Sequence, residues 1–229
     1  MLAAKYRVEV RDKEGRLVTA LEGDSKSFTM NFIKLLIASQ YNKNDVPTFT
    51  VYNVAGGAFY TGYTQSPYVG VPQQIFNIDL ILWSIYSNAV PAIWLGTSSC
   101  ADPALANGPC GSIVACCASG NLPFSPYLIS PKAPCYGITS CSPSLTEEGW
   151  AITITNRWAN VSDSAVTVAS MALVSSILTS LSTTTGEVTY ETLTNRFEPY
   201  AVIVDNLPST VIVSPGWYIT VSYTIYFPV

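Results

Sequence analysis

Histidine is absent from this sequence, and charged residues make up only 11% of it. Histidine is the commonest general base because its ordinary pKa lies near neutrality, so its absence excludes Ser-His-Asp and Cys-His catalytic systems. The nucleotide-binding patterns G-x-x-x-x-G-K-[ST] and G-x-G-x-x-G are missing too. The one adjacent acidic pair, Glu147-Glu148, would point to opposite faces of a strand, which favours a solvated loop over a catalytic dyad. We therefore expect a non-enzymatic protein with no catalytic residues and no cofactor.

Basic residues are scarce beyond residue 45. Residues 1–45 hold eight Lys/Arg and six Asp/Glu, whereas residues 46–229 hold three and nine. The sequence pI is about 4.7. A nucleic-acid binder needs a basic stripe that neutralises phosphates, so we expect no nucleic-acid partner.

Long apolar runs are also lacking. The most membrane-like stretch, Leu80 to Gly96, is interrupted by Asn88 and Pro91, whereas a spanning helix needs about 20 cleaner apolar residues. Two buried strands are the expected structure, and no membrane span is expected. The first fifteen residues lack the apolar core of a signal peptide, so either a signal has been removed or this route is not used.

Cysteine occurs only between residues 100 and 141. The surrounding segment, residues 97–149, holds seven of the fifteen prolines. An even number of cysteines in a Pro/Gly-rich stretch indicates disulfides, whose pairing the sequence leaves open. Zinc is the alternative, but the missing histidine and C-x-x-C spacing disfavour a metal site. We expect residues 97–149 to form a disulfide-braced lobe inserted into the main domain. The disulfide candidates are Cys100, Cys110, Cys116, Cys117, Cys135 and Cys141, of which the vicinal pair is not expected to bond to itself.

Strand patterns fill most of the remaining chain. Residues 5–21 predict a hairpin that turns at Asp12 to Gly15, and residues 48–61 predict a second hairpin around Gly56-Gly57. Further strands are expected near residues 75–86, 92–95 and 150–158. Short strands separated by Gly, Pro and Asn are typical of a sandwich or jelly roll. The fold class expected is all-β, an antiparallel β-sandwich of jelly-roll type, with residues 1–229 as a single domain.

One helix is expected, over residues 27–39. Asp24, Ser25 and Ser27 are all acceptable N-caps for it. Its apolar residues recur at helical spacing, which predicts a helix largely wrapped by sheet, although a partner-docking or membrane-surface helix is the alternative. The apolar stripe comprises Phe28, Phe32, Leu35 and Leu36, widened by Met30, Ile33 and Ile37.

The last strand, from Trp217 to Val229, alternates strictly. Its odd positions are apolar and predict a core face, whereas its even positions are uncharged and polar or aromatic. A face with so little charge leaves edge pairing unblocked, so we expect it to lie against the N-terminal hairpin or a neighbouring subunit. The interface candidates are Tyr218, Thr220, Ser222, Thr224 and Tyr226.

Two other features allow surface roles. Asn160-Val161-Ser162 is an N-x-S sequon at a predicted turn, so Asn160 is a glycosylation candidate. Aromatic residues could stack on sugars, although burial in the core or in a subunit interface is the commoner role of Tyr and Trp. The aromatic residues concerned are Tyr41, Tyr52, Tyr60, Tyr63, Tyr68, Trp150 and Trp158.

Three segments in a fixed order carry a resemblance: a charged hairpin followed by SKSFTMNFIKLL, then ITITNRWANVSDSAVTVASMAL, then LPSTVIVSPGWYITVSYTIYFPV. Together they resemble accessory virion proteins of tailed phages and archaeal viruses. The histidine-free, low-charge and cysteine-bearing composition fits a virus of hot acidic springs, such as a spindle-shaped archaeal virus. The resemblance implies a non-enzymatic structural subunit of a tail, nozzle, vertex or capsid. Such a subunit would be located in the virion and bind copies of itself and other virion proteins, with contact to a host surface left open.

Two alternative functions remain. The first is an extracellular filament or pilus subunit joined by strand donation, which requires a detachable terminal strand. The second is a carbohydrate-binding surface module, which requires exposed aromatic platforms.

Overall fold

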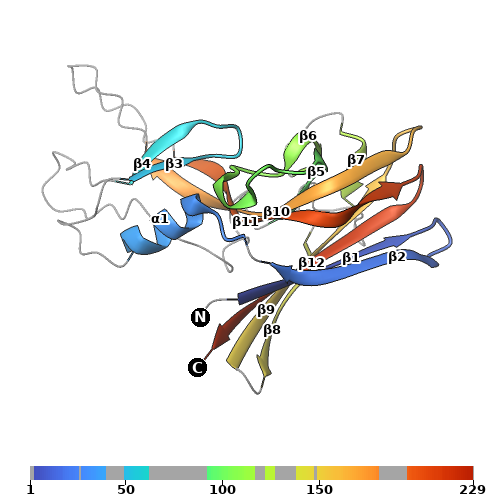
Figure 1. The fold of residues 1–229 in the computed structure, drawn as a ribbon, viewed down its shortest axis with the longest axis horizontal. Helices are drawn as coiled ribbons and strands as arrows, with labels where there is room; N and C mark the ends of the chain where they lie inside the picture. The colour runs from blue at the N-terminus through green and yellow to red at the C-terminus, as the bar shows by residue number, and fades with distance from the viewer. Residues whose placement is uncertain are drawn as a thin grey trace, which may run out of the picture.

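Two antiparallel sheets and one α-helix make up most of the computed structural model (Figure 1). The structure describes residues 3–25, 27–39, 49–61, 92–116, 122–126, 138–146, 149–180 and 195–228. The expected all-β, antiparallel character with a helix near the N-terminus is confirmed. The strand predicted near residues 75–86 lies outside the described residues.

The larger sheet has six strands in the order β2-β1-β12-β9-β7, with β8 also paired to β9. Residues far apart in the sequence meet here, because β12 lies between β1 and β9 and Ala3 faces Tyr226. Both ends of the chain therefore lie at the same end of this sheet (Figure 1). Its strands are β1 (Ala3–Arg11), β2 (Leu17–Ser25), β7 (Phe124–Pro126), β8 (Ile138–Thr146), β9 (Gly149–Asn160) and β12 (Tyr218–Pro228).

The smaller sheet has four strands in the order β11-β10-β5-β6. A separate hairpin of two short strands, with the helix and a 3-10 turn, lies beside it (Figure 1). The strands of the smaller sheet are β5 (Ala92–Ser98), β6 (Cys110–Ala115), β10 (Val166–Ser180) and β11 (Asn195–Val213). The other elements are α1 (Met30–Ser39), β3 (Phe49–Tyr52), β4 (Ala58–Thr61) and the 3-10 turn η1 (Pro103–Leu105).

Buried side chains from both sheets share one hydrophobic cluster. Alternation decides which residues enter it: on β5, Ile93 and Leu95 join this cluster, whereas Trp94 faces a second cluster on the other side. Hydrogen bonds also cross the core from β9 to β5. The Ile93 N–H donates to Asn156 Oδ1 at 2.8 Å, and Trp158 Nε1 donates to the Ile93 carbonyl at 3.1 Å.

The helix begins at Met30, three residues later than the sequence predicts. Residues 27–29 instead pair with β11, since Thr29 N–H donates to Val202 O and Val204 N–H donates to Ser27 O. Thr29 is the N-cap, because its hydroxyl accepts from Phe32 N–H at 3.2 Å. Among the described helix side chains, the buried apolar ones are Phe32 and Leu35, and the polar Asn31 is buried too. The expected widening of the core stripe is wrong, because Met30, Ile33 and Ile37 are exposed by 45, 36 and 41%.

The first hairpin forms as predicted, with Tyr6, Val8 and Val10 on its buried side. Gly15 has a φ of 85°, the left-handed conformation that a tight turn requires. The turn is organised by Asp12, whose carboxylate accepts from the backbone N–H groups of Glu14 and Arg16. It also accepts from the Arg16 guanidinium at 2.7 Å. The second hairpin also forms, with β3 paired to β4 around the predicted glycines.

Residues 97–149 contribute strands to both sheets. β6 pairs with β5 in the smaller sheet, and both β7 and β8 pair with β9 in the larger one. The described strands of this segment therefore belong to the two sheets, and the inserted lobe stays a prediction. Proline and cysteine content marked this segment as unusual, but long-range strand pairing, which composition does not encode, incorporates it into the sheets.

Candidate interaction surface

The final strand β12 alternates between buried and half-buried residues, as its sequence predicts. Ile219, Val221, Tyr223 and Ile225 are buried in the shared core. The five interface candidates all lie on the opposite side and are half-buried. β12 is an internal strand, since residues 218–226 pair with β1 on one edge and residues 218–228 pair with β9 on the other. The N-terminal hairpin is therefore its neighbour within the sheet and does not cover its even face.

Cross-strand register places hydroxyl groups opposite one another on this side. Thr224 faces Thr153 and Ser222 faces Thr155, and the two pairs of hydroxyl oxygens are 2.9 and 2.8 Å apart. Such directly opposed pairs are the unit of sheet stabilisation. The side chains are β-branched or short, so they keep few rotamers and form an ordered, uncharged strip.

Tyrosine rings lie at both ends of this strip, each beneath a cation. The Arg157 guanidinium carbon is 5.1 Å from the ring centroid of Tyr218, and Lys5 Nζ is 5.8 Å from that of Tyr226. Cation–π contacts of this kind hold both partners in place at a partly exposed site. Arg157 Nε also donates to Thr220 Oγ1 at 3.2 Å, which ties the cation to the hydroxyl strip.

The β1 side of the strip is charged. Glu9 Oε1 is 2.6 Å from Arg7 Nη2, and Glu9 Oε2 is 3.0 Å from Arg11 Nη2. The hydrogen bond from Arg11 is the largest influence on the pKa of Glu9, and burial opposes it. Together with Arg7, the arginines lower this pKa below its ordinary value. The rim therefore keeps its carboxylate ionised between two arginines.

We call this side of the larger sheet the outward face. It combines an uncharged centre of Thr and Ser side chains on β12 and β9 with charged residues on β1 and with Arg157 on β9. The sequence predicted only its β12 residues. The alternation of the ITITNRW segment indicated which side chains of β9 share one side of the strand. The pairing of β9 with β12 could not be inferred from neighbouring residues in the sequence. The outward face comprises Lys5, Arg7, Glu9, Arg11, Thr153, Thr155, Arg157, Tyr218, Thr220, Ser222, Thr224 and Tyr226.

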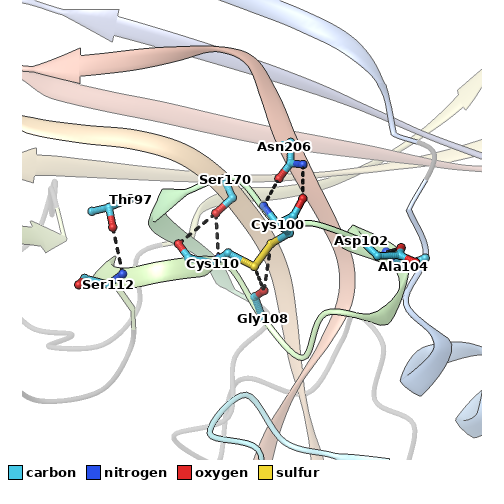
Figure 2. The surroundings of a disulfide bond; sticks show 9 residues. All are labelled: Thr97, Cys100, Asp102, Ala104, Gly108, Cys110, Ser112, Ser170 and Asn206. Carbon is cyan, nitrogen blue, oxygen red and sulfur yellow. Dashed lines mark hydrogen bonds between the residues drawn. A yellow bond between two sulfur atoms is a disulfide. The ribbon is translucent and has the colours of Figure 1, made fainter.

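One disulfide lies within the described residues, between Cys100 and Cys110, whose Cα atoms are 5.3 Å apart. Figure 2 shows how side chains dock this loop onto the smaller sheet. The Asn206 amide pairs with both backbone groups of Cys100, accepting from N–H at 2.7 Å and donating to the carbonyl at 2.8 Å. Ser170 Oγ accepts from the Cys110 N–H at 2.9 Å. These contacts fix both ends of the loop independently of the sulfur bridge.

The other cysteines are less fully described. Cys116 is half-buried against the second cluster, near Trp94. The backbone of Cys141 lies in β8 opposite Ile154. Cys117 and Cys135 lie outside the described residues. Among the described residues no cluster of three or more potential metal-binding Cys, Asp or Glu side chains occurs.

Asn160 has a structural role that conflicts with glycosylation. Its side chain is only 1% exposed. Its Nδ2 donates to the carbonyls of Val213 and Ser164 at 2.8 and 2.9 Å, and its Oδ1 accepts from both the N–H and the hydroxyl of Ser162. A glycan on Nδ2 is incompatible with this arrangement, because the nitrogen is buried and both of its hydrogens are used.

The aromatic residues considered as sugar platforms differ in burial. Trp158 is fully buried, whereas Trp150 and Tyr52 are exposed by 52 and 39%. The side chains of Tyr41, Tyr60, Tyr63 and Tyr68, like the Glu147-Glu148 pair, lie outside the described part of the structure. In that described part, no helix is long and apolar enough to cross a membrane.

Comparisons with protein-family models, curated proteins and solved structures find no match to this chain. The functional argument therefore rests on the outward face and on the sequence resemblance.

Proposed function

We propose that this chain is a non-enzymatic structural subunit of a virion, in which copies of it assemble through the outward face into a ring or shell. The same proposal covers its location in the particle and its contacts with other virion proteins. The shared core between the two sheets supports the finer fold assignment, an antiparallel sandwich of jelly-roll type. The sequence resemblance to accessory virion proteins supports the viral context.

The observation that carries the proposal is the composition of the outward face. Protein interfaces have cores depleted in charge and enriched in Tyr, surrounded by a polar rim. The outward face has an uncharged hydroxyl centre between Tyr218 and Tyr226, with Glu9 and its arginines at the margin. Its hydroxyl pairs are already formed within the chain, so association costs little side-chain entropy.

The outward face spans three neighbouring strands. At about 4.8 Å spacing, with each strand about nine residues long at about 3.4 Å per residue, they give roughly 440 Å². A standard interface buries about 800 Å² per partner, so a stable contact would extend from this face onto a neighbouring element such as β8.

Strand donation is less well supported than face packing. The terminal strand β12 is hydrogen-bonded along both edges within its own chain. Releasing it would break the sheet on both sides.

Native mass spectrometry and imaging of purified protein test the proposal directly. We expect a defined homo-oligomer, and a strict monomer over the accessible concentration range would contradict the proposal. The variant Ser222→Glu places a carboxylate at the centre of the face, where Arg7 on β1 lies opposite and can accommodate it in the monomer. We expect this variant to weaken assembly strongly. The control Ser209→Glu, at an exposed position on β11, should assemble normally.

A further inference from the structure

The outer edge of the larger sheet is formed by β2. No other described strand pairs with the side of β2 that faces away from β1. The register with β1 is regular from Thr19 to Ser25, and it shifts between Val10 and Arg11, which leaves Val18 on β2 without a partner on β1. A regular edge strand presents unpaired backbone N–H and C=O groups, which form a template for another strand.

Apolar side chains lie beside this open edge. Leu17 and Val18 at the start of β2 are exposed by 51 and 48%. Soluble proteins commonly protect an edge with lysine, proline or inward-pointing charge, and β2 has none of these between Leu17 and Leu21. The edge therefore has both the hydrogen-bonding groups and the apolar surface needed to bind a strand.

The two ends of this edge carry opposite charges. At one end, the Arg16 side chain is 76% exposed, although it already contacts Asp12 and Glu14. At the other end, Glu22 and Asp24 are exposed, and no ion pair within the described residues involves either carboxylate. An antiparallel partner with the same sequence would place its acidic end beside Arg16, and Arg16 has five donors with which to bind it. A parallel partner would bring like ends together.

We propose that β2 pairs antiparallel with β2 of a second copy of this chain, about a twofold axis at Ala20. The larger sheet then continues across the axis into the second subunit. Arg16 of each copy lies beside Asp24 of the other, and the two Ala20 residues face each other. Such an interface is isologous, with the same residues contributed by both copies. This inference rests on the proposed function, because it adds an edge contact to the contact made by the outward face.

The isologous edge contact, used together with the outward face, has a consequence for assembly. A single twofold contact ends at a dimer, whereas a second, different contact allows a closed ring or a shell. The edge and the outward face lie on different parts of the same sheet, so both can be used at once.

The test uses position 20, because a residue on a twofold axis meets its own copy. Like charges directly opposite each other across two strands are destabilising. We expect Ala20→Lys and Ala20→Glu each to raise the dissociation constant of the edge contact by roughly two- to fivefold. A mixture of the two variants should restore association, since opposite charges then meet at the axis. Ala55→Lys is the matched control, because Ala55 is an exposed alanine in the β3–β4 turn.

Sedimentation equilibrium measures the association, and circular dichroism with thermal unfolding verifies that each variant is folded. Hydrogen exchange on the unmodified chain gives an independent measurement: raising protein concentration should slow exchange at residues 18–22 and leave residues 53–57 unchanged. Association that is insensitive to both Ala20 variants would overturn the inference and leave the proposed function intact. Weakening without restoration in the mixture would also overturn it, because position 20 would not face its own copy. A wild-type chain that stays monomeric would contradict both proposals.

Discussion

Tyr223 on β12 donates a hydrogen bond to Asp205 on β11, with 3.0 Å between the phenol oxygen and Oδ2. Both residues are buried, and they belong to different sheets. Tyr6, the cross-strand neighbour of Tyr223, lies close enough for Asp205 to influence its pKa. This polar contact thus joins the two sheets, in addition to the hydrogen bonds that Asn156 and Trp158 make with Ile93.

Removing the donor of this bond should destabilise the fold. For Tyr223→Phe we expect the free energy of unfolding to fall by about 1–3 kcal/mol, because the buried carboxylate of Asp205 loses the hydrogen bond from the phenol. Urea unfolding at neutral pH measures the loss. Tyr226→Phe is the control, since its ring lies half-buried on the outward face, and a change within about 0.5 kcal/mol is expected there. Equal losses in both variants would show that the hydrogen bond to Asp205 is not the cause.

Alkaline pH should also destabilise the protein through its buried tyrosines. Burial is the main cause that raises the pKa values of Tyr6, Tyr200 and Tyr223, and Asp205 raises those of Tyr6 and Tyr223 further. Unfolded tyrosine titrates near pH 10, so these groups contribute their full stability below that pH. As pH rises above it, the unfolded chain loses protons that the folded chain retains, and stability falls.

The expected slope is about 1.4 kcal/mol per pH unit for each fully buried tyrosine. Urea unfolding between pH 9 and pH 11.5, together with a tyrosine absorbance titration, measures it. The double variant Tyr200→Phe/Tyr223→Phe should show a shallower decline than the wild type. An unchanged decline would assign the alkaline sensitivity to other groups.

The Cys100–Cys110 disulfide should contribute stability through a short loop. With a sequence separation of 10, the loop-entropy relation gives an upper estimate of about 3 kcal/mol for the double variant Cys100→Ala/Cys110→Ala. Asn206 and Ser170 still hold the loop ends, so we expect faster hydrogen exchange at residues 99–112 and unchanged exchange in β1 and β12. Loss of protection throughout both sheets would show that the bridge is required for the core itself.

Asn160 should be essential for the β9–β10 connection and should not bear a glycan. We expect Asn160→Ala to cost about 2–4 kcal/mol, since it removes the Nδ2 donor from the buried Val213 carbonyl and from the Ser164 carbonyl. Ser162→Ala also destroys the sequon but removes only one hydroxyl donor, which lies within reach of Asn160 Oδ1 and the Ser164 carbonyl, so a smaller loss is expected. Denaturant unfolding compares the two variants. Intact mass after expression in a glycosylating cell tests for the glycan, whose presence on folded protein would contradict the buried position.

Local patterns predicted the elements whose geometry is set locally. The alternation of β12 identified its buried face, and Gly15 identified the first turn, because both signals depend on neighbouring residues alone. The helix start was misplaced because residues 27–29 satisfy their backbone groups on β11, which lies far away in sequence. Met30, Ile33 and Ile37 fit a helical stripe, but tertiary packing covers only one side of it.

The candidate surface was predicted only in part for the same reason. The sequence identified the even residues of β12, but it did not reveal that Thr153 and Thr155 lie beside them, since that depends on which strands become neighbours. The Asn-x-Ser sequence at Asn160 predicted a glycosylation site. The same residue types also form turns in which the asparagine side chain bonds the backbone two residues later, as Asn160 does with Ser162. No local signal distinguished a buried, hydrogen-bonded asparagine from an accessible one.

The position of β12 between β1 and β9 also dictates the order in which the larger sheet can form. The β1–β2 hairpin is synthesised first, yet its inner edge finds its partner only when residues 218–226 have been made. Until then β1 and β9 have no strand between them, and contacts of such large sequence separation form slowly. Completion of this sheet therefore follows synthesis of residues 218–226, and until then the inner edge of the hairpin is open to wrong strand pairing.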